Sequence, residues 1–371
     1  MMICLCLCFK GNPFFCLAER REEESVYQIL DENFIEVNSS YDVVVGDMFI
    51  SEDNMLYEIY EIDEKFLIAY ARRVEKVDLP KVEEPNKISQ IKTYDKKIGM
   101  YHTHNDESYV IGDGYDSVYG EGGIMDIGDA FARELKKFNI QVYENDTLHL
   151  PHNSTAYARS KVTAQKLLNS VSLDAIFDVH RDGVPRKQFV GEVKGREMSK
   201  IRIVIGKSNS NYAQNLQFAK EIKAYADKNY PGLIKDIYMG SGNYNQNLSK
   251  TALLFEMGTY LIEKDYVYSA LPYLADTIDK VIYTDAVSST ENEKQNEDNN
   301  KNEPLENNNS EIPNNSTNQE SVENVIEDKK TENINTSTKS VFIAIFLLSV
   351  VGGGILLFLI NLREIKKKRK K

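Results

Sequence analysis

The chain has 371 residues, 42% of them hydrophobic, which is enough for one to three domains with a sizeable core. Its formal charge is −12, but residues 363–371 carry a net +6, which leaves −18 for the rest. An acidic body offers no electrostatic basis for binding nucleic acid, because phosphate neutralisation needs clustered Lys and Arg. The four cysteines all lie at or before Cys16, so the body of the chain has neither a disulfide framework nor a cysteine metal site. Any metal must be held by histidine and carboxylate.

The amino-terminal part of the sequence divides into three segments. Residues 1–18 are largely apolar and end in a small residue but lack a positively charged start, which predicts a degenerate or truncated signal segment. Residues 19–81 show alternating hydrophobicity and a polar turn at 52–54, which predicts a small β-rich region. It could be a separate add-on domain or an edge of the next one, and nothing in it suggests chemistry. Residues 82–95 are predicted to be a linker.

Residues 96–287 alternate between strand and helix patterns. Strands are expected at 98–102, 140–143, 175–179, 201–205 and 252–255, and helices at 124–138, 155–168, 211–229 and 266–283, the last broken or kinked near Pro272. This alternation predicts an α/β fold, a mostly parallel sheet with helices on both faces. The glycine-rich loop at 112–123 lacks the spacing of a dinucleotide-binding motif.

The carboxyl-terminal part predicts a membrane anchor. Residues 288–340 are rich in Asn and Glu and poor in aromatic residues, which predicts a disordered tether. Residues 341–362 carry no charge, and at 1.5 Å per residue they can cross a bilayer core of about 30 Å as a transmembrane helix. The basic segment 363–371 is then a cytosolic tail, which places the domain at 96–287 outside the cytosol, on the cell membrane.

Polar residues follow three of the predicted strands. The segment IGMYHTHNDESY carries His104 and Glu107, the segment DVHRDG carries His180, and the segment ALLFEMGT carries Glu256. Carboxyl ends of parallel strands meet at one edge of a sheet, so these four side chains are expected to lie together. A carboxylate after four apolar residues is costly unless it is paired, bound to a ligand or functional.

These residue types suit a zinc site. Zinc hydrolases commonly use three nitrogen or oxygen ligands, and His104, Glu107 and His180 supply them. His102 is an alternative ligand, since alternate residues of a strand point to the same face. The spacing His104-x-x-Glu107 favours His104.

The remaining roles follow from the chemistry of amide hydrolysis. Glu256 could take the proton of the attacking water as general base. Arg181 could help to stabilise the developing oxyanion. Asp182 or Asp178 could orient a ligand histidine through its second ring nitrogen.

Together, the segments YHTHNDESY, DVHRDG and LLFEMGT resemble the stage II sporulation protein P family, and the resemblance covers about residues 96–285. That family is similar to the zinc N-acetylmuramoyl-L-alanine amidases. The resemblance implies a phosphorylase/hydrolase-like α/β fold, with His104, Glu107 and His180 binding Zn²⁺ and Glu256 as the base. It implies cleavage of peptidoglycan, at the amide between muramic acid and the stem peptide and at peptide cross-links, during septal wall thinning and engulfment in sporulation. It also implies a place at the sporulation septum, with the stage II sporulation proteins D and M as partners.

The chain departs from this family in two respects. The family is anchored by an amino-terminal membrane segment, whereas the span expected here is carboxyl-terminal, and the related amidases place their ligand glutamate farther from the first histidine.

Two other functions fit the same residues. A metallocarboxypeptidase would use the same ligands but needs a buried arginine for the substrate carboxylate, for which Arg181 and Arg202 are the candidates. A cell-wall-binding scaffold would carry the same cluster without activity. The two other histidines, His149 and His152, are expected to be exposed polar residues of a loop.

Overall fold

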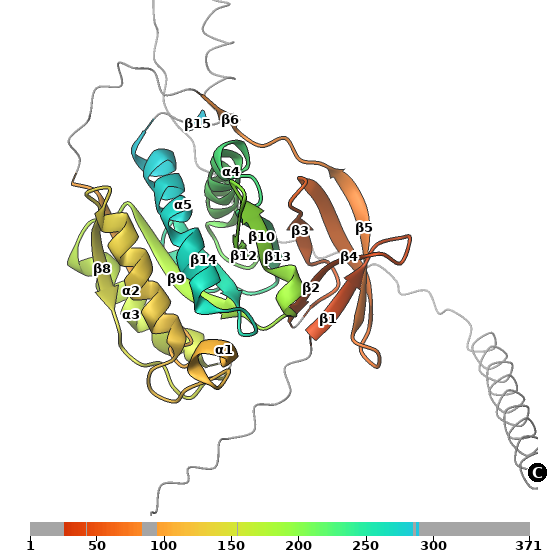
Figure 1. Ribbon diagram of the computed structural model, residues 1–371, viewed down its shortest axis with the longest axis horizontal. Coiled ribbons are helices and arrows are strands. Elements are labelled where there is room, and N and C mark those ends of the chain that lie inside the picture. Colours follow the sequence, from red (N-terminus) through yellow and green to blue (C-terminus); the bar gives the residue numbers. More distant parts are fainter. Residues whose placement is uncertain (1–25, 42, 84–94, 154, 285–286, 289–371) are drawn as a thin grey trace, which may run out of the picture. The chain divides into compact units, whose positions relative to one another are not determined.

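A sheet of eleven strands organises the part of the chain that the structure, a computed structural model, describes (Figure 1). The described residues are 26–41, 43–83, 95–153, 155–284 and 287–288. The chain divides into two units, 1–303 and 304–371, and the described residues belong to the first. Within the described ranges, no helix is long and apolar enough to cross a membrane. The predicted signal segment, the membrane span, the basic tail, and almost all of the linker and the tether lie outside them.

Five strands that precede residue 80 form one end of the sheet. They are β1 (Val26–Leu30), β2 (Glu36–Tyr41), β3 (Met48–Ile50), β4 (Met55–Asp63) and β5 (Ile68–Lys76). β3 pairs antiparallel with β13 (Ile234–Gly240), with Ile50 opposite Ile237. The amino-terminal region is therefore built onto the edge of the following α/β part.

The other six strands carry the candidate site. They are β7 (Lys97–Tyr101), β8 (Gln141–Asn145), β9 (Ala175–Asp182), β12 (Ile201–Gly206), β13 and β14 (Ala252–Thr259). Their order is β13-β12-β14-β9-β7-β8, and each neighbouring pair is parallel except β12 with β14. The predicted mostly parallel sheet is thus correct for these six strands, whereas the amino-terminal strands make the whole sheet mixed. β13 was not predicted, because Lys235 and Asp236 interrupt its apolar pattern.

Helices cover both faces of the sheet, as predicted. They are α1 (Val110–Asp113), α2 (Gly123–Lys136), α3 (Ala156–Ser170), α4 (Tyr212–Asn229) and α5 (Lys264–Tyr283). α2, α4 and α5 lie over one face, where the core includes Phe131, Phe177 and Phe255, and Figure 1 shows α5 beside α2. α3 covers the other face, where Leu167 packs with Tyr101.

The remaining elements are short. They are the two-stranded sheets β10 (Val190–Val193) with β11 (Arg196–Ser199) and β6 (Lys81–Val82) with β15 (Val287–Ser288), and the 3₁₀ turns η1 (Arg186–Gln188) and η2 (Gln246–Leu248). Of the break or kink expected near Pro272, the break is absent, since α5 continues through that residue.

Strand β9 shows how the sequence sorts side chains between the two faces. All of its residues are buried. Phe177 and Val179 belong to the apolar core beneath α2 and α5. Because side chains alternate along a strand, Asp178, His180 and Asp182 lie on the opposite face. Buried polar groups need partners there, and this face holds the candidate site.

Strand β14 bends just after Glu256. Its register with β9 shifts between Glu256 and Thr259, and Gly258 there has φ +82°, in the left-handed region that favours glycine. A Cβ on Gly258 would lie 2.8 Å from the Oγ of Ser199. Nearby, the Tyr109 hydroxyl donates to the Met257 carbonyl at 2.7 Å, which ties β14 to the segment that carries Glu107.

Candidate metal centre and active-site pocket

Three neighbouring strands place ionisable residues in one row across the sheet. In the pairing of β9, β14 and β12, His180 lies opposite Glu256 and Glu256 lies opposite Arg202. Directly opposed residues point to the same face. β9 and β14 run parallel and present these side chains toward their carboxyl ends, whereas β12 runs the other way and presents Arg202 from its amino-terminal end.

The other two candidate ligands come from the turn after β7. The Glu107 N–H donates to the His104 carbonyl at 3.3 Å, which brings the two side chains to the same side. The Ser108 N–H donates to the Asp116 carbonyl at 2.9 Å and fixes the loop that follows. The backbone N–H of Arg181 donates to Glu107 Oε2 at 2.9 Å. That bond leaves Oε1 of Glu107 directed at the histidines.

The three candidate ligand atoms have the spacing of a zinc site. Glu107 Oε1 is 3.2 Å from His104 Nδ1 and 3.4 Å from His180 Nδ1. All three atoms lie within 4.8 Å of one another. Two ligands at about 2.0 to 2.1 Å from a tetrahedral zinc lie about 3.3 Å apart. The donor set and its spacing therefore fit one zinc ion.

The charges around the cluster favour a cation. Burial lowers the pKa of His104 to about 4, so its ring is neutral at pH 7. Burial opposes ionisation of Glu107, but the attraction of His180 and the contact with His104 outweigh it and hold the pKa of the carboxyl well below its usual range. Burial also opposes charge on His180, yet Asp178 and Glu107 raise its pKa well above the usual range. Two carboxylates thus draw positive charge to this point, as a divalent metal requires.

The structure separates the two carboxylates that could orient a ligand histidine. Asp178 Oδ1 lies 2.9 Å from His180 Nε2, within the distance of an ion pair. Asp178 is held in place by the N–H of Thr103 at 2.8 Å and its hydroxyl at 2.6 Å. Asp182 instead accepts from Arg202 Nη1 at 2.7 Å. Asp178 therefore occupies the orienting position, and Asp182 is engaged elsewhere.

His102, the alternative ligand, lies apart from the cluster. Its Nδ1 is 2.8 Å from the Val179 carbonyl. Its other ring nitrogen lies against α2, where a Cβ on Gly128 would come within 2.4 Å of it. β7 ends at Tyr101, so the strand alternation that would put His102 and His104 on one face does not continue.

Glu256 faces the same pocket from β14. Its Oε2 is buried and has no hydrogen-bond partner in the described part of the chain. Burial, and then the nearby Asp182, raise its pKa well above the usual range, although His180 acts in the opposite direction. A buried carboxyl without a partner is costly, and a raised pKa is typical of a carboxyl that transfers protons near neutral pH.

A buried network beside Glu256 joins the α/β part to the amino-terminal region. Arg202 donates to Asp182 at 2.7 Å and to Asp236 at 2.8 Å. It also donates to Asn38 Oδ1 at 2.8 Å and to the Ser39 carbonyl at 2.9 Å, both in β2. The amino-terminal region, for which the sequence suggested no chemistry, therefore supplies part of the wall around the site.

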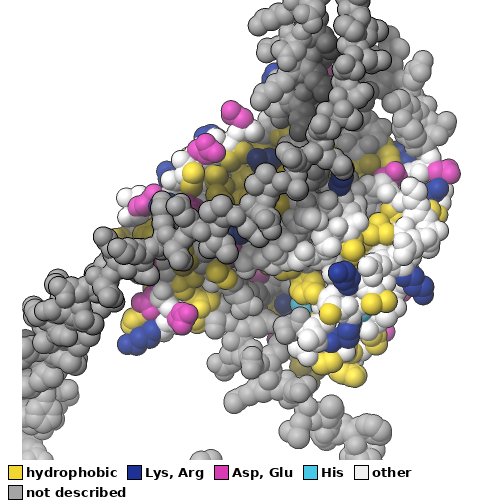
Figure 2. All heavy atoms as spheres, turned by 180° about the vertical axis from the view of Figure 1, so that it is seen from behind, with side chains coloured by type: hydrophobic (Ala, Val, Ile, Leu, Met, Phe, Trp, Pro, Cys, Tyr) yellow, Lys and Arg dark blue, Asp and Glu magenta, His cyan; other side chains and the backbone are white. Residues whose placement is uncertain are grey.

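The candidate ligands and Glu256 share one pocket of about 210 Å³. Tyr157 of α3, Tyr238 of β13 and Tyr244 of the following loop line it. Histidine side chains reach the surface on the face seen in Figure 2, among hydrophobic and basic side chains. The His104 side chain is 16% exposed, so solvent reaches the candidate ligands.

The expectation that His149 and His152 are exposed loop residues is wrong. His149 is 2% exposed and lies between the His102 carbonyl at 2.7 Å and the Thr163 hydroxyl at 2.8 Å. His152 lines the pocket, with its Nδ1 2.8 Å from Asp106 Oδ1 and its ring stacked on His104 at 3.8 Å between centroids. No local pattern marked His152, because a loop position alone does not reveal burial.

Arg181, predicted to stabilise an oxyanion, holds a loop. Its Nε donates to the Ser108 carbonyl at 3.2 Å and its Nη2 to the Asp116 carbonyl at 2.9 Å. The guanidinium carbon of Arg181 lies 5.7 Å from the centre of the Tyr260 ring. The side chain lines the pocket, but these two bonds secure the segment that carries Glu107.

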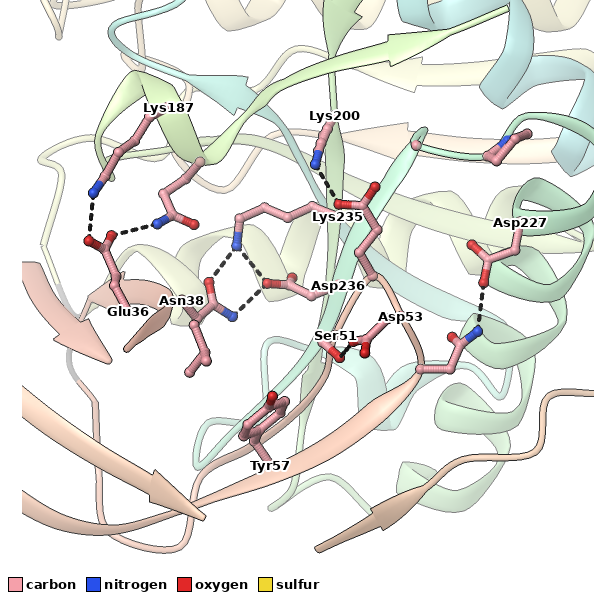
Figure 3. A pocket seen from close by; sticks show the side chains of 16 residues that line it. Glu36, Asn38, Ser51, Asp53, Tyr57, Lys187, Lys200, Asp227, Lys235 and Asp236 are labelled. Carbon is pink, nitrogen blue, oxygen red and sulfur yellow. Dashed lines mark hydrogen bonds and ion pairs between the residues drawn. The ribbon is translucent and has the colours of Figure 1, made fainter. Parts of the chain in front are cut away.

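A second and larger cavity, of about 890 Å³, lies on the other side of the Arg202 network (Figure 3). Asn38 and Asp236 line it and also bind Arg202, so they form the wall between the two cavities. Lys235 Nζ binds both of these residues, at 2.5 Å from Asn38 Oδ1 and 2.6 Å from Asp236 Oδ2. Two further ion pairs line this cavity, Lys187 with Glu36 and Lys200 with Glu52, and Figure 3 shows the first of them. None of the candidate ligands lines this cavity.

The fold and the site define an α/β protein with a candidate His–Glu–His metal centre at the carboxyl edge of its sheet. The family described as Stage II sporulation protein P matches residues 46–279. The chain belongs to this family.

Comparison with individual proteins agrees with this family. The stage II sporulation protein P of Bacillus subtilis (strain 168) is 31% identical over 185 residues, which are 45% of this chain and 46% of that protein. The match thus spans less than half the length of this relative.

Two solved structures are more distantly similar. An N-acetylmuramoyl-L-alanine amidase from Clostridium difficile 630 is 14% identical, with a TM-score of 0.32, over 50% of this chain and 94% of that one. The catalytic domain of the CD27L endolysin targeting Clostridia difficile is 15% identical, with a TM-score of 0.33, over 50% of this chain and 96% of that one. Scores this low leave both likenesses too distant to support an activity for the chain.

Proposed function

We propose that this protein is a zinc-dependent peptidoglycan hydrolase of sporulation, an N-acetylmuramoyl-L-alanine amidase that also cuts peptide cross-links. The observation that carries the proposal is the meeting of His104, Glu107 and His180 with the buried carboxyl of Glu256 in one pocket. Membership of the stage II sporulation protein P family supports the substrate and the process.

The metal would be held by His104 Nδ1, Glu107 Oε1 and His180 Nδ1. When bound there, zinc would polarise the amide carbonyl, acidify the attacking water, and lower the pKa of the nearby Glu256. Asp178 would keep His180 oriented through its second ring nitrogen, and the backbone N–H of Arg181 would keep Glu107 Oε2 away from the ligand position.

Glu256 would move the proton in this reaction. The carboxylate accepts a proton from water as its oxygen attacks the amide carbonyl carbon, and the carbonyl π electrons move to oxygen. The C–N bond then breaks, and the proton passes from Glu256 to the leaving nitrogen. The products are a carboxylic acid and an amine, and Glu256 is regenerated.

The arginine contacts favour this reaction over that of a carboxypeptidase. A carboxypeptidase needs a buried guanidinium that is available to a substrate carboxylate. The guanidinium of Arg202 already binds the carboxylates of Asp182 and Asp236. That of Arg181 binds two backbone carbonyls.

The proposal extends to the location and the partners. The uncharged segment 341–362 and the basic segment 363–371 favour a cell-membrane anchor with the catalytic part outside the cytosol, at the sporulation septum. The sporulation proteins D and M are the proposed partners, on family resemblance. Protease treatment of intact cells should cleave the catalytic part and leave the basic tail intact.

The test is a digest of purified peptidoglycan by the full chain, read by mass spectrometry of the released fragments. Release of free stem peptides, together with peptide-free glycan, would establish amidase cleavage. Loss of a single carboxyl-terminal residue would point to the carboxypeptidase. A chelator and Glu256→Gln should each abolish release, with folding unchanged.

Glu263→Gln is the matched control. Glu263 pairs with Arg186 at 2.8 Å, 38% exposed and away from the pocket, so its variant should keep full activity. Activity that survives Glu256→Gln would overturn the assignment of the base. A folded protein without stoichiometric zinc or product would favour the scaffold.

A further inference from the structure

Tyr157 is a tyrosine of the pocket for which neither the sequence nor the mechanism above has a role. It lies in the first turn of α3, on the face of the sheet that carries His180. Its side chain lines the pocket with the candidate ligands.

The ring of Tyr157 is fixed by three aromatic neighbours. It meets His104 edge-on at 5.5 Å between centroids and 67° between planes. It lies at 6.4 Å and 20° from His180, and at 5.5 Å and 59° from Tyr244. The Tyr157 ring therefore stands beside both candidate ligand histidines in the pocket.

The backbone at this position is fixed as well. Asn245 Nδ2 donates to the Tyr157 carbonyl at 3.0 Å and to the Ser160 hydroxyl oxygen at 3.0 Å. Asn245 and its neighbour Tyr244 both have positive φ, +57° and +50°, an uncommon conformation for two successive residues with side chains. The loop after β13 is thus held in a strained shape that supports Tyr157 and places Tyr244 against its ring.

A phenol hydroxyl can donate a hydrogen bond, and a hydrogen-bond donor is what a developing oxyanion requires. Tyr157 lines the same pocket as Glu107, His180 and Glu256.

We propose that Tyr157 donates a hydrogen bond to the carbonyl oxygen of the scissile amide as negative charge develops there. This inference rests on the proposed function. It gives Tyr157 the role that the sequence assigned to Arg181, whose guanidinium is bonded to the carbonyls of Ser108 and Asp116. No proton is transferred: the O–H bond stays intact while the oxyanion forms and collapses, and Glu256 alone carries the proton to the amine.

The test is Tyr157→Phe in the full chain, which keeps the ring and removes the hydroxyl. On a soluble muropeptide, kcat should fall about 100-fold while KM stays within about threefold, because the bond strengthens only in the transition state. Zinc content and thermal stability should match the wild type. A phosphinate mimic of the tetrahedral species should bind more weakly by a similar factor, which a merely structural role would not produce.

Tyr143→Phe is the matched control. The Tyr143 hydroxyl donates to Gln141 Oε1 at 3.1 Å within β8, and its variant should leave kcat unchanged. If the wild type cleaves the amide and Tyr157→Phe keeps kcat within about threefold, the role of Tyr157 is refuted and the amidase stands. If the wild type releases no amide-cleavage product, the amidase function and the role of Tyr157 are both refuted.

Discussion

Replacing Arg202 by methionine tests whether the buried network joins the two parts of the molecule. Arg202 is 2% exposed, and its loss leaves two buried carboxylates short of a partner. Asp236 would keep Lys235 Nζ at 2.6 Å, whereas Asp182 would keep the N–H of Gly183 at 2.7 Å. Removing one partner of a buried ion pair costs about 3 to 5 kcal/mol. Because Asp236 stays paired, the lower end of this range, about 3 kcal/mol of unfolding free energy, is expected.

Equilibrium unfolding of the full chain in urea measures this loss. Arg72→Met is the control, because Arg72 pairs with Glu58 at 2.7 Å while it is 58% exposed, and exposed pairs contribute less than about 1 kcal/mol. Adding Asp182→Asn to Arg202→Met should recover part of the loss, since the uncompensated charge is removed. Hydrogen exchange should also quicken in β2, which loses the bonds from Arg202 to Asn38. Equal losses for the Arg202 and Arg72 variants would refute the buried network.

Three further predictions concern charge, metal and core. Burial, and then Arg202, lower the pKa of Lys235 to about 8 from 10.5. In the unfolded chain Lys235 therefore keeps its proton up to a higher pH than in the folded chain. The free energy of unfolding should rise by up to about 3 kcal/mol between pH 8 and 10.5. Lys235→Met should remove this rise in unfolding curves measured across that pH range. His180→Ala should reduce zinc from about one ion per chain to none by elemental analysis of the purified protein; unchanged zinc would contradict the ligand set. Phe177→Ala, which removes a ring packed 5.1 Å from Phe255, should cost about 3 to 5 kcal/mol in urea unfolding, and a loss under about 1 kcal/mol would contradict the packing.

The sequence predicted the parts of the site that depend on local pattern. His180 and Glu256 stand within apolar runs, and a buried strand has only one place to put a charged side chain, on the face away from the core. The meeting of these residues with Glu107 followed from the parallel arrangement of β7, β9 and β14. The spacing of His104 and Glu107 favoured His104 over His102, but the strand alternation that kept His102 as an alternative depends on where β7 ends.

The rest of the site depends on contacts between residues far apart in the chain. Arg202 meets Asn38 across 164 positions, and no periodicity reports such a pairing. β13 was missed for the same reason, since Lys235 and Asp236 look like surface residues until their partners are known. His152 and Tyr157 belong to a loop and to the first turn of a helix, where composition does not distinguish a pocket from solvent.

The pairing of β3 with β13 determines how the protein can be shortened. A fragment that starts at the linker would uncover the hydrogen-bonding edge of β13 and the apolar side chains beside it, such as Tyr238. Exposed edges of this kind invite pairing between molecules. Such a fragment would also leave the guanidinium of Arg202 without Asn38. A soluble, monomeric fragment that keeps the candidate site is therefore expected to need residues from β1 onward, and the strands from β1 to β5 belong to the same folded body as the strands that carry the histidines.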